Sequence, residues 1–259
     1  MGRLATLLAV GCWPGSLRAG TRREVEEVHF VAANDFHHQS PACDSWFEQL
    51  FRQIGAHPDL AFTVGLGDLA DLGLRDSLAS IARASGLIGV PFYATPGNHD
   101  NAIDGTSDIY AEIFPGRLNY TWAHGGWQFV AIDTTEGKKW NETVVSAGTL
   151  AWLDATLPTL DRESPTLLFT HFPLAEGVRM CPLNAEDVLA RFVEFNLQGV
   201  FSGHFHSQTA ETRHDVVLVT NVCCSRVVNN HDGTTRKGYW LCKAKRDGTV
   251  ERSFVEFCG

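Results

Sequence analysis

The chain has 259 residues, of which 44% are hydrophobic and 20% charged, and its formal net charge is −9 at pH 7. This composition is ordinary for a soluble globular protein with a full-sized core. The acidic balance argues against a general nucleic-acid binder, so no nucleic-acid polymer is expected as a partner, whereas a small phosphate compound stays possible because bound cations supply a local positive field.

Residues 1–24 precede the first predicted strand and are expected to be a signal peptide or a disordered leader. The stretch MGRLATLLAVGCW has one basic residue before an apolar run that is too short to span a membrane. The following PGSLRAG is a poor cleavage site, so a ragged start of the chain stays an alternative. No transmembrane segment is expected, and the predicted location is secreted or periplasmic, with the cytoplasm as the alternative.

The first half of the remaining chain alternates strands with helices. Buried strands are predicted over residues 28–35, 60–68 and 90–100, and helices over 44–55 and 75–86. In the first helix the apolar face consists of Trp46, Phe47, Leu50, Phe51 and Ile54. Asp44 or Ser45 is expected to cap its start, and Gly55 to end it.

The second half continues the alternation and then becomes rich in strands. Residues 118–133 predict a hairpin with HGG as its turn. The further predictions are helices over 150–157 and 184–195, and strands over 165–173, 199–206, 215–221, 239–245 and 249–257. The whole pattern predicts an α/β fold with two packed sheets and helices outside them, in one domain over residues 25–259.

Seven cysteines are present, and six remain if the leader is removed with Cys12. An even number suits disulfides in an oxidising compartment, and buried reduced thiols are the alternative. The absence of a CxxC pair argues against a zinc site built from thiolates.

Five predicted strands end in side chains that can bind a metal. They are Asp35 and His37, Asp68, Asn98 to Asp100, His171, and His204 with His206. Ligands of open α/β sheets bind at such strand ends, because rigid elements support the loops there. A mixture of His, Asp and Asn suits zinc, iron or manganese better than calcium. Each group alone has an ordinary structural explanation, and the combination carries the argument.

These groups resemble the motifs of the calcineurin-like metallophosphoesterases, which read D-x-H, G-D-x-x-D, G-N-H-D/E, a lone His, and G-H-x-H. Here they are DFH at 35–37, GDLAD at 67–71, GNHD at 97–100, THFP around His171, and GHFH at 203–206. The resemblance covers residues 28–206 and all five motifs. It implies a four-layer α/β/β/α sandwich of two mixed sheets flanked by helices, with a dinuclear metal site at the strand ends.

The resemblance also implies which residues hold two divalent or mixed-valence transition-metal ions (Mn, Fe or Zn). The first ion would be held by Asp35, His37 and His206, the second by Asn98, His171 and His204, and Asp68 would bridge both. A shared carboxylate is physically reasonable, since it reduces the repulsion between two cations about 3.5–4 Å apart. The reaction implied is hydrolysis of a phosphate ester by metal-activated hydroxide.

Two further residues follow from the third motif. The resemblance implies that His99 binds the phosphate together with Asn98 and protonates the leaving oxygen, and Asp100 is expected to orient His99 through a hydrogen bond. In an extended chain residues i and i+2 face the same way, so Asp35 is expected to lie beside His37. His38 would then point away, into solvent or at the substrate mouth.

Departures from the motifs favour one branch of the family. His37 and Asp71 disfavour the purple acid phosphatases, and Leu72 and Asp100 disfavour the protein phosphatases, which have Arg and Glu there. The pattern is most similar to bacterial cyclic-nucleotide phosphodiesterase-like phosphohydrolases, so small phosphodiesters are the predicted substrates. A phosphomonoesterase, a nucleotide pyrophosphatase and a non-catalytic metal-binding scaffold stay as alternatives.

Overall fold

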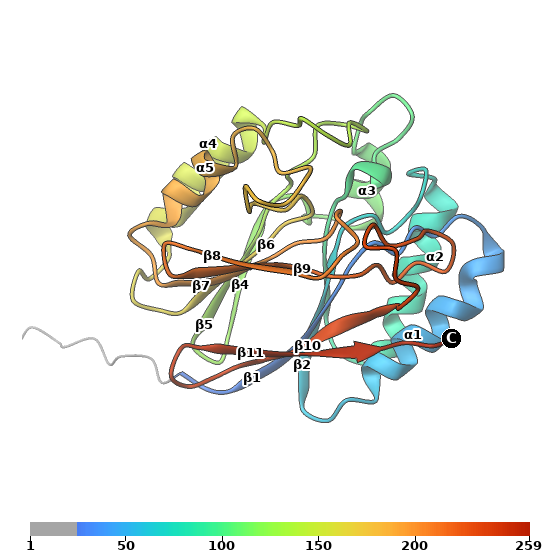
Figure 1. Cartoon of the computed structure of the whole chain (residues 1–259), viewed down its shortest axis with the longest axis horizontal. Helices are drawn as coiled ribbons and strands as arrows, with labels where there is room; N and C mark the ends of the chain where they lie inside the picture. Colours follow the sequence, from blue (N-terminus) through green and yellow to red (C-terminus); the bar gives the residue numbers. More distant parts are fainter. Residues whose placement is uncertain (1–24) are drawn as a thin grey trace, which may run out of the picture.

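The structure is a computed structural model that describes residues 25–259, so the leader predicted over residues 1–24 lies outside it. Within the described range the strands form one sheet of five strands and one of six, which face each other (Figure 1). The predicted arrangement of two mixed sheets between layers of helices is confirmed.

The first sheet has the order β11-β10-β1-β2-β3. Its strands are β1 (Val28–Ala33), β2 (Leu60–Leu66), β3 (Phe92–Thr95), β10 (Gly238–Ala244) and β11 (Val250–Glu256). The three N-terminal strands run parallel, while β10 and β11 add to them in antiparallel fashion. The parallel strands therefore all end at the same edge of the sheet.

The second sheet has the order β4-β5-β6-β7-β9-β8. Its strands are β4 (Tyr120–His124), β5 (Trp127–Ala131), β6 (Thr166–Phe169), β7 (Leu197–Phe201), β8 (Thr209–Arg213) and β9 (Val216–Thr220). The predicted hairpin is confirmed, with Gly125 and Gly126 both at positive φ in the turn between β4 and β5. The central strands β5, β6, β7 and β9 run parallel.

Helices cover the outer face of each sheet (Figure 1). The α-helices are α1 (Asp44–Gly55), α2 (Arg75–Ser85) and α3 (Asp108–Ile113) beside the first sheet, and α4 (Ala147–Thr156) and α5 (Ala185–Leu189) beside the second. Short 3-10 helices are η1 (Pro41–Cys43), η2 (Gly86–Ile88), η3 (Asn98–Asp100), η4 (Leu157–Thr159) and η5 (Ala190–Phe192). No helix in the described range has the length and apolar character needed to cross a membrane.

The alternation of side chains along β1 divides the core. Phe30 packs between the sheets, while its neighbour Val31 packs against the helices outside. We call the buried phenylalanines between the sheets the inter-sheet layer; they are Phe30, Phe62, Phe129, Phe169 and Phe201. Phe30 and Phe62 stack with ring centroids 5.3 Å apart, and Phe30 meets Phe201 edge-on at 5.8 Å.

Several local predictions differ from the structure. α3 and β8 are missing from the prediction, since elements of six and five residues are too short to show a clear apolar periodicity. The predicted strand 199–206 ends at Phe201 as β7, so the whole GHFH motif lies beyond it. α1 begins at Asp44 and ends at Gly55 as expected, but its N-terminus has no side-chain cap.

The structure also shows the state of the cysteines. All six cysteines of the described residues are free, and four of them are buried, so the alternative of reduced thiols holds rather than disulfides.

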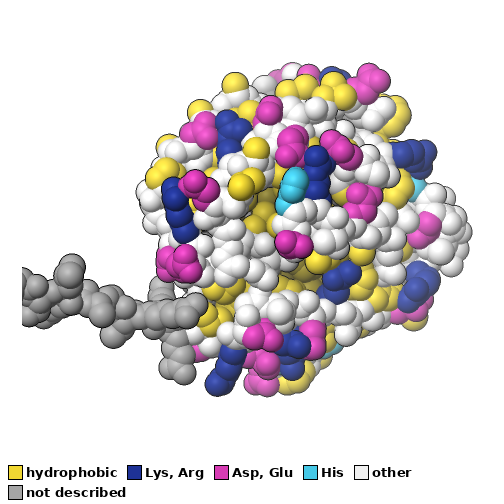
Figure 2. Space-filling view, turned by 60° about the vertical axis from the view of Figure 1, so that its left-hand side comes forward, with side chains coloured by type: hydrophobic (Ala, Val, Ile, Leu, Met, Phe, Trp, Pro, Cys, Tyr) yellow, Lys and Arg dark blue, Asp and Glu magenta, His cyan; other side chains and the backbone are white. Residues whose placement is uncertain are grey.

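On the face shown in Figure 2, Lys and Arg side chains lie among Asp and Glu rather than in a basic patch. Ion pairs such as Arg191 with Asp154 illustrate this mixing.

Candidate metal centre

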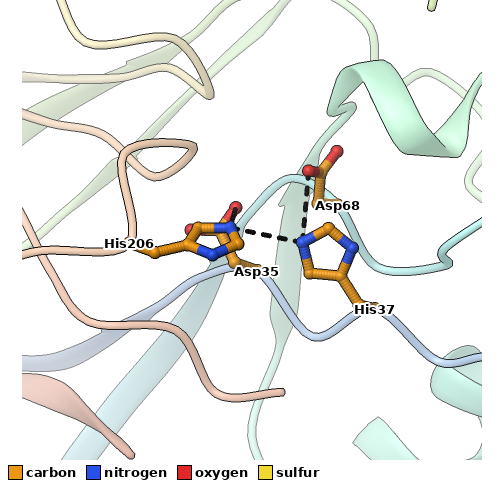
Figure 3. A group of neighbouring side chains, drawn as sticks. All are labelled: Asp35, His37, Asp68 and His206. Carbon is orange, nitrogen blue, oxygen red and sulfur yellow. Dashed lines mark hydrogen bonds and ion pairs between the residues drawn. The ribbon is translucent and has the colours of Figure 1, made fainter. Parts of the chain in front are cut away.

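The polar side chains predicted at the strand ends meet at one edge of the two sheets. Asp35 and His37 follow β1, Asp68 follows β2, and His206 arrives from the loop after β7. Each of these four residues offers one ligand atom, and the atoms lie within 4.8 Å of one another. Figure 3 shows the four side chains turned toward a common point. The group therefore combines residues from both sheets.

In this first cluster two imidazole nitrogens and two carboxylate oxygens approach one another closely. His37 Nε2 lies 3.3 Å from His206 Nε2 and 3.4 Å from Asp68 Oδ2. His206 Nε2 in turn lies 3.2 Å from Asp35 Oδ1. All four residues are buried. Two nitrogens and two carboxylate oxygens thus converge on one small, dry volume.

A second cluster lies on the other side of Asp68. It contains His171 and His204, whose ligand atoms also lie within 4.8 Å of an Asp68 oxygen. His171 Nε2 is 3.3 Å from Asp68 Oδ1 and 3.3 Å from the side-chain oxygen of Asn98. Asp68 therefore faces the first cluster with one carboxylate oxygen and the second with the other.

Gly97 makes room for this shared carboxylate. A Cβ atom at Gly97 would lie 2.1 Å from Asp68 Oδ1, a distance that no real side chain could accept. The amide of His99 donates to the same oxygen at 2.9 Å. The glycine of the GNHD motif thus permits the close approach of η3 to Asp68.

Each of the four cluster histidines uses its second ring nitrogen elsewhere. His37 Nδ1 lies 3.0 Å from Asp71 Oδ1, His206 Nδ1 3.2 Å from Asn229 O, His171 Nδ1 2.8 Å from Leu66 O, and His204 Nε2 2.8 Å from Trp140 O. An acceptor at one nitrogen fixes the proton there and leaves the other nitrogen with a free lone pair. Two such lone pairs 3.3 Å apart, at His37 and His206, repel unless a proton or a metal ion lies between them. The donor set therefore fits a metal ion.

The backbone of the clusters is left-handed rather than extended. The φ angles of Asp35, His37, Asp68, His204 and His206 are 54°, 48°, 51°, 64° and 45°. Our expectation that Asp35 and His37 lie side by side because the chain is extended is therefore wrong in its reason. Asp and His tolerate this conformation better than most residues, and such strained positions concentrate at functional sites.

The carboxylates and imidazoles strongly affect one another's protonation. Burial alone would lower the pKa of His206, but the Asp35 carboxylate raises it to about 11. Burial alone would also lower the pKa of His171, but the carboxylates of Asp68 and Asp35 raise it to about 9. Burial and the adjacent His171 ring lower the pKa of His204 to about 3.

The carboxylates respond in the opposite direction. Burial raises the pKa of Asp35, but the stronger combined effect of His206 and His171 leaves it below its usual range. Burial is likewise outweighed at Asp68, where His171 and His37 hold the pKa well below the ordinary value. Both carboxylates therefore stay ionised, and the field that attracts protons to the imidazoles also attracts cations.

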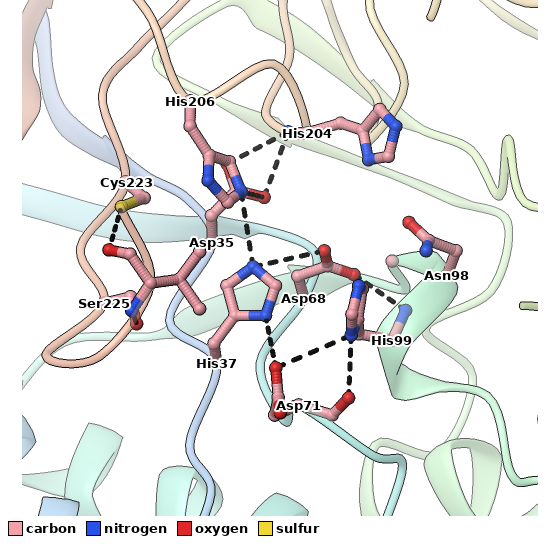
Figure 4. Close-up of polar contacts among 12 residues, drawn as sticks. Asp35, His37, Asp68, Asp71, Asn98, His99, His204, His206, Cys223 and Ser225 are labelled. Atoms are coloured by element: carbon pink, nitrogen blue, oxygen red, sulfur yellow. Dashed lines mark hydrogen bonds and ion pairs between the residues drawn. The ribbon is translucent and has the colours of Figure 1, made fainter. Parts of the chain in front are cut away.

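His99 lies beside the clusters with its side chain partly open to solvent. Its Nδ1 donates to the backbone oxygen of Asp71 at 2.7 Å, and its ring lies 4.7 Å from that of His37 (Figure 4). Asp71 thus contacts both histidines, one through its carboxylate and one through its backbone. Asp71 is the second aspartate of the GDLAD motif, and that position in the motif is the sequence signal for its role.

Asp100 occupies a different position from the one expected. Its two carboxylate oxygens accept hydrogen bonds from the amides of Ala70 and Gly97, at 2.7 and 2.8 Å. The His99 ring donates its hydrogen bond to the backbone oxygen of Asp71 instead. Burial and the nearby Asp68 raise the pKa of Asp100. Asp100 ties η3 to the loop after β2, so it orients His99 only through the backbone.

His38 is buried, contrary to the expectation that it lies in solvent or at the substrate mouth. Only 2% of the residue is exposed, and its Nε2 lies 2.7 Å from Asp44 Oδ1. Ser80 donates to the same oxygen at 2.5 Å. Asp44 therefore joins His38 to α2 and leaves the start of α1 uncapped, which explains the failure of that prediction too.

A comparison with protein families decides the affiliation of the chain. The sequence model of the calcineurin-like phosphoesterase family matches residues 28–208. The chain belongs to this family. The match begins at β1 and ends just after His206, so it includes every residue of both clusters. This calcineurin-like phosphoesterase is a phosphoric ester hydrolase of a metal-dependent family with a dinuclear centre.

Curated relatives share part of the sequence. A 3′,5′-cyclic-nucleotide phosphodiesterase of Nostoc sp. is 26% identical over 205 residues, which cover 74% of this chain and 74% of that protein. A protein of Fibrobacter succinogenes named "Probable cyclic nucleotide phosphodiesterase" is 30% identical over 172 residues, 62% of this chain and 64% of its own. Both names describe phosphodiesterases.

Solved structures share the fold of this calcineurin-like phosphoesterase. The purple acid phosphatase PPD1 from yellow lupin seeds superposes with a TM-score of 0.65 at 14% identity, covering 90% of this chain and 52% of that one. GAP50 of Plasmodium gives 0.63 at 12% identity, with coverage of 89% and 84%. At such identities the likeness concerns the fold alone.

Proposed function

We propose that this enzyme hydrolyses small phosphodiesters, with cyclic nucleotides or related compounds as substrates, at a centre of two transition-metal ions. The observation that carries the proposal is Asp68, whose two oxygens face two separate clusters of histidines. Such a shared carboxylate suits a pair of cations and has no evident use in a purely structural cluster. The names of the relatives in Nostoc and Fibrobacter support the choice of substrate class.

The first ion would be held by the cluster that Figure 3 shows, and the second by Asn98, His171 and His204, with Asp68 common to both. Nitrogen and carboxylate donors together favour manganese, iron or zinc over calcium. When bound, the two cations activate water as a nucleophile and neutralise charge on the phosphoryl oxygens.

His99 would contact the substrate. Because Asp71 O holds Nδ1, the ring presents Nε2 on its other side, and the side chain is 39% exposed. A histidine so placed can donate a proton to the leaving oxygen. Asn98, the preceding residue, would contact the same phosphate. Asp100 keeps both in place through its hydrogen bonds to Ala70 and Gly97.

The surroundings of the site favour diesters over monoesters. A monoester carries a second negative charge near neutral pH, which calls for an additional cationic side chain. At the position after the GDLAD motif stands Leu72, 55% exposed, where the protein phosphatases carry arginine. The phosphomonoesterase and nucleotide pyrophosphatase alternatives therefore rank second.

The test is a comparison of two chromogenic substrates on one preparation. Purified protein would be loaded with Mn²⁺, its metal content measured, and its kcat/KM determined for bis-p-nitrophenyl phosphate and p-nitrophenyl phosphate. We expect two ions per chain and a clear preference for the diester. Preference for the monoester would establish the monoesterase, and the absence of any turnover by the loaded protein would establish the scaffold.

A further inference from the structure

Trp140 stands at the edge of the second cluster with its side chain toward solvent. It is 60% exposed and is the one tryptophan among residues 25–259 that is classed with the exposed large apolar residues. Its backbone oxygen accepts the hydrogen bond from His204 Nε2 at 2.8 Å. The backbone of Trp140 therefore contacts the second cluster through His204, while most of its indole remains uncovered.

The segment that carries Trp140, residues 136–144, is closed on itself. The Glu136 carboxylate accepts from the amide of Val144 at 2.9 Å and from Lys139 Nζ at 3.1 Å. Lys139 N also donates to Glu136 O at 3.2 Å. We call this segment the rim loop. Its closure holds Trp140 at the tip of the loop.

The rim loop is also anchored to its neighbours. Asn101, just after η3, donates to Gly137 O at 3.0 Å and accepts from Lys138 Nζ at 2.8 Å. On the other side, Leu183 N donates to Thr143 O at 2.8 Å. An indole on an anchored loop loses little freedom when a ligand packs against it, so the entropic cost of binding is small.

The two lysines of the rim loop are already engaged. Lys138 donates to a backbone oxygen, and Lys139 is paired with Glu136. Neither ammonium group is therefore free to receive a second phosphate of a substrate. The flat apolar face of Trp140 is exposed on this loop and offers a surface for recognition.

We propose that the indole of Trp140 stacks on the heteroaromatic base of a nucleoside phosphodiester bound at the metal centre, and so determines substrate specificity. The inference rests on the proposed function, because it needs a phosphodiester at the clusters. Stacking on an exposed tryptophan tolerates any base, since every base has a π face. The rim loop thus combines two tasks: its backbone orients His204, and its one exposed indole selects the organic part of the substrate.

The test compares a nucleotide with its base-free counterpart. KM and kcat would be measured for adenosine 3′,5′-cyclic phosphate and for ribose 3′,5′-cyclic phosphate, with the wild type, Trp140→Ala and Trp140→Phe. In Trp140→Ala the ratio of the nucleotide KM to the base-free KM should rise about 5- to 150-fold, which corresponds to ~1–3 kcal/mol. Trp140→Phe should recover most of the loss. Val193→Ala, at an exposed apolar residue on η5's C-terminal side, is the matched control.

A second readout does not depend on turnover. Titration with adenosine 5′-monophosphate should quench a part of the tryptophan fluorescence that Trp140→Phe lacks. Equal increases in KM for both substrates, or a loss of bound metal in Trp140→Ala, would show that Trp140 acts by orienting His204 and would overturn the stacking role. If the wild type hydrolysed no phosphodiester, the proposed function would fail, and the titration alone would decide about Trp140: a quench lost in Trp140→Phe supports stacking, and no quench refutes it.

Discussion

The inter-sheet layer and the metal centre are built from the same strands, a few residues apart, and both are shielded from water. Phe30 lies in the layer and Asp35 follows at the end of β1; Phe169 lies in the layer and His171 follows β6. The layer stabilises the folded state by removing apolar surface from water. The centre destabilises the folded state, because its charges are buried and its backbone is left-handed. A rigid apolar region therefore holds a strained polar one in place.

The difference between the two regions predicts different consequences of mutation. Each left-handed non-glycine residue costs on the order of 1–3 kcal/mol, and five of them lie in the centre. Substitutions in the centre should mainly change metal content and rate. Substitutions in the layer should mainly change the free energy of unfolding.

The largest effect is expected for Asp68→Asn. The substitution removes the charge that both clusters share, so the protein should lose bound metal, and kcat/KM for a phosphodiester should fall by at least about 10⁴-fold. Metal analysis together with the kinetics checks this. Asp59→Asn is the matched control, since Asp59 also has a positive φ but is exposed and remote. Retention of both ions by Asp68→Asn would contradict the expectation that substitutions in the centre mainly change metal content.

A similarly large effect, but on stability, is expected for Phe129→Ala. Phe129 is buried, with its ring centroid 4.9 Å from that of Phe62 and 5.1 Å from that of Trp122. Truncation leaves a cavity and should lower the free energy of unfolding by about 3–5 kcal/mol. Denaturant unfolding of the metal-free protein measures it, with Ile103→Ala, at a residue 95% exposed, as the control. The folded variant should still bind two ions.

His99→Ala separates rate from metal binding within the centre itself. The ring is held by Asp71 O and belongs to neither of the two clusters that share Asp68. Its removal should lower kcat by about 10²- to 10³-fold through loss of a proton donor, while the metal content stays at the wild-type value. A variant that had lost its metal would show that His99 supports the ions rather than the reaction.

The smallest effect is expected for His38→Ala, and its comparison with the adjacent His37→Ala shows where the metal centre ends. His38→Ala removes a partner of the partly buried Asp44 carboxylate and should lower the free energy of unfolding by ~1–2 kcal/mol. His37→Ala should instead empty the first cluster. The pair would be compared by metal analysis and thermal unfolding. Metal loss in His38→Ala would place it in the centre after all.

Much of the fold follows from apolar periodicity. The strands of the parallel core and the hairpin turn at Gly125 were predictable because buried β-rich runs and glycine turns are local signals. α3 and β8 were not, because they are only six and five residues long. The uncapped start of α1 was missed because the Asp44 carboxylate bonds to His38 and Ser80. These tertiary contacts outweigh the local preference of aspartate for capping a helix.

The residues of the centre were named from the motifs, and the structure brings them together, but their supports were not foreseeable. Leu66, Trp140 and Asn229 each hold a cluster histidine through a backbone oxygen. Every residue type has a backbone oxygen, so no sequence pattern indicates which one accepts such a hydrogen bond. The support of His37 is the exception, because it is the carboxylate of Asp71, which belongs to the GDLAD motif. The left-handed φ angles were missed because the strand prediction was extended too far past Ala33 and Phe201.

Both clusters take residues from both sheets, and this determines the order in which the protein can be assembled. His37 and His206 are 169 positions apart in the chain, yet their ring nitrogens meet at 3.3 Å. Neither cluster is complete until the second sheet has docked on the first through the inter-sheet layer. We therefore expect metal capture to be a late step of folding. An ion held there would link the two sheets at that edge.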